Sequence, residues 1–316
     1  MVNLNGILLA LAAFGFFATH DVVIKTLGGI YSPFQLIFFA VLLSFPLVTF
    51  MLMRDATTGH LRPVHPWWIA IRTAAGVIGG VSAFFAFSVL PLAQTYSILF
   101  ASPLLITVLS IPILGEQVRL RRWLAVIVGL IGVLIVLRPG SEDLGLGHLA
   151  ALSAAAASAL ASIIVRKIGR EERSVVLLLY PMAANFVVMA CALPFVYKPM
   201  PIEHFAMVGL ISLFGFIAGL CLIAAYKNAE AAVVAPMQYS QIIWATIFGY
   251  FFFAELPDRE TFLGAGVIIL SGLYIVFRES RSQVSDNTPV LRTRSRHETG
   301  STFRISPFVR RYFPKK

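Results

Sequence analysis

The chain has 316 residues, of which 58% are hydrophobic and only 13% are charged, and its mean hydropathy is +0.84 with a net charge of +10. Soluble domains carry about a quarter charged residues, so this composition excludes an ordinary soluble protein. It predicts a chain that lies mainly in a bilayer.

Ten apolar stretches follow one another between residues 6 and 278, joined by short connections. Each is about as long as the roughly 20 residues that a spanning helix needs, which leaves little chain for a separate soluble catalytic domain. We therefore predict an all-α integral membrane protein. The predicted spans lie near 6–27, 33–53, 67–89, 92–114, 121–138, 147–167, 174–197, 204–226, 232–254 and 261–278.

The second five stretches repeat the first five in order. Residues 6–26 align with residues 147–167 at an offset of 141, with several glycine, leucine and alanine positions in common. We predict one five-helix repeat at residues 1–140 and a second at residues 141–278. Because five crossings is an odd number, the second repeat is inverted in the membrane, as it is in many secondary transporters.

The distribution of Lys and Arg predicts the orientation, because positive residues in short loops stay on the cytoplasmic side. With the N-terminus inside, the inner side of the helical body holds eleven Lys and Arg residues, whereas the outer side holds only four, which are Lys25, Arg138, Lys198 and Arg259. We therefore expect both termini in the cytoplasm. Residues 1–5 carry no Lys or Arg, so the first stretch is predicted to be a retained span and not a secretory signal.

The C-terminal segment, residues 279–316, is basic. The stretch from Arg278 to Lys316 holds ten of the 25 Lys and Arg residues against three acidic ones, which is +7 of the net +10. Its Ser-, Thr- and Arg-rich composition predicts a disordered tail held at the anionic inner leaflet. Nucleic-acid binding is the more specific alternative. No folded nucleic-acid-binding module accompanies the basic residues, so we expect no nucleic-acid partner.

Asp21 is the only carboxylate well inside a predicted span, and Lys25 follows it one turn later on the same helix face. Two interpretations are open. The two residues form a self-satisfied ion pair, with Lys25 reaching to the surface. Alternatively, Asp21 faces a central cavity, where it binds a substrate amine or takes up a proton with His20 as its partner. The aligned residue in the second repeat is Ser162, so the pair is not repeated.

Uncharged polar side chains gather in the fourth and ninth stretches, which are equivalent helices of the two repeats. In the ninth, Gln241 and Trp244 share one helical stripe with Gln238 at its edge, and Tyr96 lies in the fourth. Interhelical hydrogen bonds, worth about 1 kcal/mol each, are the simpler explanation for any one of these residues. Together they predict a pocket for an uncharged or zwitterionic organic molecule with a ring.

The pairs Gly76 and Gly80, and Gly215 and Gly219, align at an offset of 139 and place a small-residue motif on equivalent helices. Such motifs let helix backbones approach closely. Packing inside one subunit is the first interpretation, and a homodimer interface is the second. Several prolines interrupt the spans and favour bending: Pro46, Pro103, Pro112, Pro181 and Pro194.

No pattern in the chain indicates catalysis, a metal or a cofactor. The phosphate-loop pattern and the H-E-x-x-H pattern are absent. Cys191 and Cys221 lie in apolar stretches without C-x-x-C spacing. We expect no catalytic residue, no bound metal and no cofactor, and transport driven by a gradient or by exchange.

Two stretches, residues 91–117 and 235–259, resemble the EamA-type members of the drug/metabolite transporter superfamily. Each ends a helix with a Gly-Glu or Ala-Glu pair, followed by a short polar turn and a Gly-containing span, which that family repeats in both halves. Residues 20–26, the Ala235-Pro236 pair and residues 255–259 look most like the branch that includes S-adenosylmethionine uptake carriers. Riboflavin carriers and amino-acid exporters belong to the same wider group. The resemblance implies a ten-helix carrier of the bacterial inner membrane that works without ATP hydrolysis.

These observations predict a secondary transporter for a small organic metabolite of amino-acid, nucleoside or vitamin-like type. Its expected partners are that substrate and the membrane lipids. A flippase for lipid-linked substrates within the same superfamily is the nearest alternative, and it would need a side cleft open to lipid. An integral-membrane enzyme or a non-transporting scaffold are more distant alternatives, and the clustered His, Asp or Glu residues of such an enzyme are missing.

Overall fold

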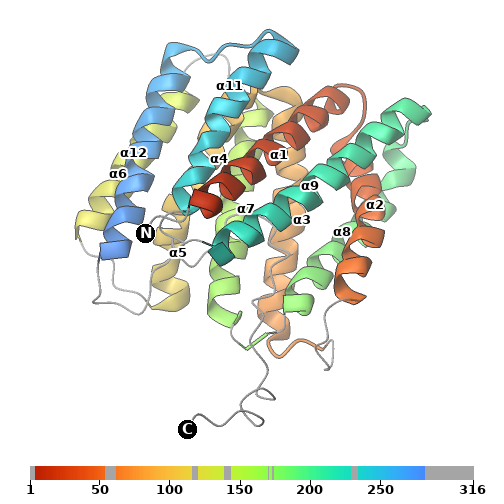
Figure 1. The fold of residues 1–316 in the computed structure, drawn as a ribbon, viewed down its shortest axis with the longest axis horizontal. Coiled ribbons are helices and arrows are strands. Elements are labelled where there is room, and N and C mark those ends of the chain that lie inside the picture. The colour runs from red at the N-terminus through yellow and green to blue at the C-terminus, as the bar shows by residue number, and fades with distance from the viewer. Residues whose placement is uncertain are drawn as a thin grey trace.

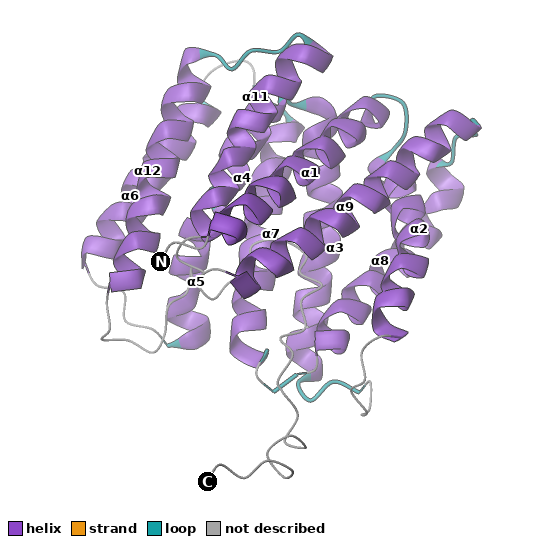
Figure 2. Ribbon diagram, viewed as in Figure 1, coloured by secondary structure: helices purple, strands orange, loops and turns teal. Residues whose placement is uncertain are grey.

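The computed structural model describes residues 4–53, 62–115, 120–138, 144–169, 171–172, 174–228 and 234–281. Within these ranges the chain consists of helices and their connections (Figure 2). The basic tail from residue 282 onward lies outside the described residues, so its predicted disorder and its position at the inner leaflet stay predictions.

The first repeat contains α1 (Leu4–Gly28), α2 (Pro33–Met53), α3 (Pro66–Val89), α4 (Leu92–Leu99), α5 (Ser102–Leu114) and α6 (Leu120–Leu137). The second contains α7 (Leu146–Ile168), α8 (Ser174–Val196), α9 (Ile202–Asn228), the 3₁₀ helix η1 (Ala235–Tyr239), α11 (Ser240–Phe253) and α12 (Arg259–Arg281). Among the described residues, six segments are long and apolar enough to cross a membrane, counting Leu92–Leu114 as one, and Pro33–Leu47 and Trp123–Leu137 are shorter apolar helices. The protein is an all-α membrane protein.

The packing of the helices is symmetric between the two repeats. α1 packs along α9 and α3 packs along α7, while α2 packs on α8, α4 on α11 and α6 on α12 (Figure 1). Exchanging the repeats turns the α1–α9 contact into the α7–α3 contact and maps each of the other three pairs onto itself. Two inverted repeats related by a pseudo-two-fold axis produce this pattern, which confirms the predicted fold class.

The fourth and ninth spans are broken; the sequence predicts an interruption at Pro103 in the fourth span and none in the ninth. α4 ends at Leu99 and α5 begins at Ser102. Pro103 has no N–H for the carbonyl of Leu99, and its ring crowds that carbonyl, so the helix is interrupted four residues before the proline. The ninth span begins as the 3₁₀ helix η1, which contains Pro236, and becomes α-helical at Ser240.

Glycines permit a close helix crossing between α6 and α12. A Cβ at Gly264 would lie 2.7 Å from the carbonyl oxygen of Gly132, and a Cβ at Gly132 would lie 2.9 Å from the carbonyl oxygen of Gly264. Only residues without a side chain permit this approach. The crossing joins the last helix of each repeat along one edge of the bundle (Figure 1).

The four glycines of the predicted packing motif lie on α3 and α9. Gly76 faces Pro181 of α8 and Gly80 faces the side-chain oxygen of Asn185, also on α8, while Gly215 lies against the ring of His20. Gly219 is buried. The contacts of Gly76, Gly80 and Gly215 therefore lie inside one subunit.

Candidate substrate site

The buried carboxylate of Asp21 lies on α1 and joins it to α4. Asp21 is 1% exposed, and its Oδ1 lies 2.7 Å from Nδ1 of His20. Its Oδ2 accepts a short hydrogen bond from the hydroxyl of Tyr96, which is also 1% exposed. A carboxylate out of contact with water needs such partners, because an unpaired buried charge costs several kcal/mol.

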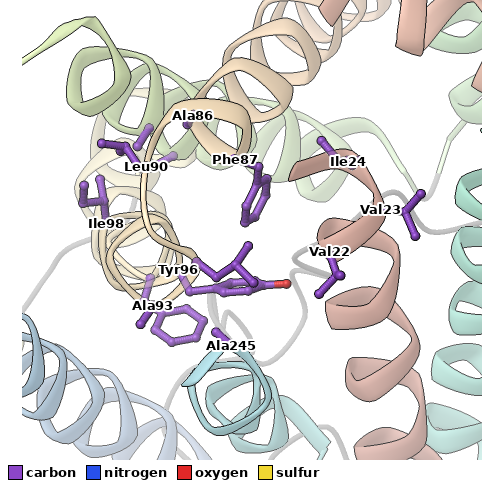
Figure 3. Packing of buried hydrophobic residues seen from close by; sticks show 14 of the residues in the cluster. Val22, Val23, Ile24, Ala86, Phe87, Leu90, Ala93, Tyr96, Ile98 and Ala245 are labelled. Carbon is purple, nitrogen blue, oxygen red and sulfur yellow. The ribbon is translucent and has the colours of Figure 1, made fainter. Parts of the chain in front are cut away.

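Aromatic packing fixes the position of Tyr96. Its ring contacts Phe87 of α3, with ring centroids 5.2 Å apart, and Phe100, with centroids 6.2 Å apart. Figure 3 shows the Tyr96 ring reaching from α4 toward α1, with its hydroxyl directed at the α1 segment that carries Val22. Contacts with these aromatic rings therefore hold the hydroxyl donor in place.

His20 lies at the junction of three helices. Its ring is perpendicular to the ring of Phe84 on α3, with centroids 6.3 Å apart, and it faces Gly215 of α9, where an added Cβ would lie 3.6 Å from the imidazole. His20 and Asp21 thus connect α1 to α3, α4 and α9, so a change of charge at this pair acts on helices of both repeats.

Lys25 does not take the role that its spacing from Asp21 suggests. Its Nζ forms an ion pair with Oε1 of Glu255 at 2.8 Å and donates to the carbonyl oxygen of Leu90 at 2.5 Å. Asp21 is instead held by His20 and Tyr96. Asp21 and Lys25 therefore do not satisfy each other as an ion pair: Lys25 pairs with Glu255, and Asp21 bonds to His20 and Tyr96.

The predicted polar stripe of the ninth span lies on η1 and α11. Gln241 is 5% exposed, and its amide Nε2 has no hydrogen-bond partner among the described residues. Trp244, one turn further, packs its indole against Gly15 of α1 and stacks on Phe248, with ring centroids 5.9 Å apart. Gln238 is half-buried in η1. An unpartnered buried amide donor beside an indole is suited to a ligand with an acceptor and a ring.

The structure arranges the candidate residues in two groups along α1. Asp21, His20 and Tyr96 form one group, and Gln241 and Trp244 of α11 form the other, in which Trp244 lies at Gly15. Gly15 and Asp21 are six residues apart on α1, which is about 9 Å along the helix axis. This separation matches the length of a small metabolite.

Sequence reasoning missed the roles of three residues. The sequence marks Glu255 through the repeat and the family resemblance alone, yet Glu255 is the partner of Lys25. Phe100 and Tyr239 pack edge to face at the two helix breaks. The shared offset of 139 between Phe100 and Tyr239 was the available signal. Among the described residues no group of His, Cys, Asp or Glu side chains could hold a metal ion.

A bundle of two inverted five-helix repeats around a buried carboxylate is the architecture of a secondary transporter. The chain belongs to the EamA-like transporter family, whose profile matches residues 4–138 and again residues 145–278. It is a transporter of this family and not an enzyme.

Several bacterial transporters are similar to the chain over most of its length. The S-adenosylmethionine uptake transporter of Rickettsia prowazekii is 28% identical over 284 residues, which cover 89% of this chain and 96% of that protein. The one from Rickettsia bellii is 27% identical over 266 residues, covering 84% and 91%. The pseudopaline exporter CntI of Pseudomonas aeruginosa is 24% identical over 273 residues, covering 84% and 94%. The relatives thus include both an uptake system and an exporter.

One solved crystal structure has a similar fold. It superposes with a TM-score of 0.60 and covers 88% of this chain and 98% of that chain, at 19% sequence identity. At this identity the likeness concerns the fold alone.

Proposed function

We propose that the protein transports a small organic metabolite that carries a positive charge and a ring, by alternating access and without ATP hydrolysis. In this proposal it works in the bacterial inner membrane with both termini in the cytoplasm. The Lys and Arg asymmetry of the sequence supports this orientation.

The observation that carries the proposal is the burial of Asp21 at the junction of helices from both repeats. Ionisable groups inside a membrane protein are costly and usually serve a substrate or a proton. A cationic group of the substrate would replace the hydroxyl of Tyr96 or the ring of His20 as the partner of the carboxylate. Because Asp21 contacts α4 through Tyr96, substrate binding there would alter the packing of α1 on α4 within the first repeat.

The second group of candidate residues supports a substrate that has a ring and a hydrogen-bond acceptor. Trp244 offers an indole face or edge, and the unpartnered Nε2 of Gln241 offers a buried donor. S-adenosylmethionine, which the Rickettsia relatives take up, has a sulfonium cation, an amine and an adenine ring with acceptor nitrogens. It is therefore the first compound to test.

The test is a thermal-shift screen of the purified protein against S-adenosylmethionine, riboflavin, amino acids and polyamines. A ligand that binds only the folded protein stabilises it by about 2.7 kcal/mol at a concentration of 100 Kd. We expect a saturable shift with a cationic ligand that is lost in Asp21→Asn and weakened in Gln241→Ala and Trp244→Ala. Glu260→Gln is the matched control, because Glu260 is an exposed carboxylate at the start of α12.

Two outcomes would contradict the proposal. A hit that binds Asp21→Asn as tightly as the wild type would remove Asp21 from the site. The absence of any hit in the panel, together with stabilisation by lipid-linked compounds, would favour the flippase alternative.

A further inference from the structure

Lys25 and Glu255 join the two repeats at the end of the bundle where α1, α3 and α11 end, which is uppermost in Figure 1. We refer to this as the upper end. The positive-inside prediction makes it the outer side of the membrane. Lys25 belongs to α1 of the first repeat, and Glu255 to the α11–α12 loop of the second.

Four contacts converge on this pair. Lys25 Nζ lies 2.8 Å from Glu255 Oε1, donates to the Leu90 carbonyl, and lies 5.1 Å from the centroid of the Phe253 ring. Glu255 Oε2 lies 3.4 Å from the backbone N–H of Leu92, at the start of α4. The contacts connect α1, the α3–α4 turn, α4 and the α11–α12 loop.

The pair lies directly above the candidate substrate site. Lys25 and Asp21 are four residues apart on α1, about 6 Å along the helix axis. Asp21 holds α4 through Tyr96, and Lys25 holds the α3–α4 turn at Leu90. Opening the upper end above Asp21 requires α1 to separate from α4 and from the α11–α12 loop, so it requires these contacts to break.

The side chains of Lys25 and Glu255 are 9% and 28% exposed, respectively, which is more buried than an ordinary surface pair. The attraction between the two charges is strong in this position, but it is largely offset by the loss of hydration that pairing imposes. Water that enters an open upper end would hydrate both ions again. An ion pair of this kind can therefore close and open with a small difference in free energy, which a gate needs.

We propose that Lys25 and Glu255 form the gate that closes the upper end of the transporter, and that they separate when this end opens to admit or release substrate. This inference rests on the proposed transport function. By sequence, the same charges recur at the opposite end, since Lys25 aligns with Arg166 at the offset of 141 and Glu255 with Glu116 at 139. Glu116 lies outside the described residues, and the proposal concerns the upper pair alone.

A second ion pair at the upper end provides a matched control. Arg138, which follows α6, pairs with Asp258 and Glu260 near the start of α12. It also joins the two repeats, but its partners are about half exposed, and it lies on the α6–α12 edge of the bundle. Its removal disturbs a cross-repeat ion pair without touching the contacts above Asp21.

The first experiment measures access to the bundle from the outer side. Cys191 and Cys221 are replaced by serine, and Ser97→Cys is introduced next to Tyr96, because Ser97 is fully buried on α4. A membrane-impermeant maleimide is added to right-side-out vesicles. We expect Lys25→Gln to raise the labelling rate about tenfold through a shift toward the open form, the K25E/E255K exchange to restore it, and Arg138→Gln to leave it unchanged. Equal rates in the wild type and Lys25→Gln would overturn the proposal.

The labelling experiment needs no substrate, so it separates a wrong gate from a wrong proposed function. A second variant adds K25C and E255C to the protein that carries Ser97→Cys and neither native cysteine. These two cysteines are bridged with a short cleavable bifunctional thiol reagent, and labelling is read on the peptide that contains position 97. We expect the bridge to abolish maleimide labelling at Ser97→Cys and cleavage to restore it. A bridged protein that is still labelled at the rate of the unbridged variant would show that the upper end opens without separating these two positions, which also overturns the proposal.

Discussion

The rings of Phe100 and Tyr239 pack edge to face, with centroids 5.1 Å apart and planes at 81°. The two residues are 139 positions apart, the offset that relates Gly76 to Gly215, so they are equivalent in the two repeats. Phe100 lies at the break between α4 and α5, and Tyr239 lies where η1 meets α11. Equivalent residues contact each other only at the symmetry axis, so both helix breaks lie at the pseudo-two-fold axis that relates the repeats.

The fit of Tyr239 against α12 gives the first prediction. A Cβ at Gly272 would overlap the Tyr239 hydroxyl and lie 2.8 Å from Cζ. Gly272→Ala is expected to lower the free energy of unfolding by about 1–3 kcal/mol through overpacking. Adding Tyr239→Phe to Gly272→Ala removes the hydroxyl that the new Cβ would overlap, so the double variant is expected to regain part of the lost stability. Thermal unfolding in detergent measures both effects.

Gly266 provides the control for this prediction, since it lies on the same helix and a Cβ there would have no neighbour within 4 Å. Gly266→Ala is expected to be neutral or slightly stabilising, as alanine has the better helix propensity. Equal losses of stability in Gly272→Ala and Gly266→Ala would contradict the prediction, because only Gly272 lies against Tyr239.

The break in the fourth span gives the second prediction. Pro103→Ala supplies the N–H that Leu99 lacks, so α4 and α5 are expected to form a more continuous helix. Hydrogen exchange of peptides covering the break should slow, and transport of the ligand found by thermal shift should fall. Pro112→Ala is the control, because Pro112 lies inside α5 without ending it. Unchanged exchange at the break in Pro103→Ala would assign the break to packing alone.

The hydrogen bond from Tyr96 to Asp21 gives the third prediction. Tyr96→Phe leaves a buried carboxylate oxygen with one donor fewer, which is expected to cost about 1–3 kcal/mol of stability. In an Asp21→Asn background the same change is expected to cost less, because the charge that needs the donor is gone. A double-mutant cycle measures this coupling. Additive losses would mean that the hydroxyl and the carboxylate do not stabilise one another.

The sequence predicts the fold well because span length, composition and repeat offset are properties of the chain read in order. The helix breaks are different: Pro103 ends a helix, whereas Pro112 lies inside one. The two prolines lie in one apolar stretch, and each removes one backbone N–H, so residue type alone does not tell them apart. Local pattern therefore located the spans and five candidate prolines, but not which of these prolines breaks a helix, nor the 3₁₀ start of the ninth span.

The candidate site shows the same limit. Asp21 could be predicted from the sequence because a charged side chain in an apolar span is energetically costly and usually serves a function. Its partner Tyr96 is 75 residues away, and the partner of Lys25 lies in the other repeat. Spacing along one helix favoured an Asp21–Lys25 pair, but tertiary contacts supplied better-placed partners for both. Which polar residues meet across helices depends on how the repeats pack, and one sequence does not specify that.

The start of α12 gives the last prediction, which concerns pH. Oδ1 of Asp258 accepts the N–H of Thr261 at 2.9 Å and so caps the helix, while Oδ2 pairs with Arg138. Burial raises the pKa of this carboxyl, but the hydrogen bonds from Thr261 and Arg138 outweigh it, and the pKa lies below the ordinary value of 3.8. The ionised form is thus favoured by folding, so its stabilisation is fully present above pH 3.8 and is lost as the pH falls through the lower folded pKa.

Asp258→Ala is therefore expected to lower stability by about 1 kcal/mol near neutral pH, which is the usual effect of losing a helix cap. Asp258→Asn keeps the cap and removes only the exposed ion pair, so it is expected to cost about 0–1 kcal/mol. Thermal unfolding between about pH 3 and pH 7 tests the sign, because the difference between the wild type and Asp258→Asn should shrink as the carboxyl is protonated. A difference that grew on acidification would show that the folded protein favours the protonated carboxyl, and that the contacts with Thr261 and Arg138 do not control its titration.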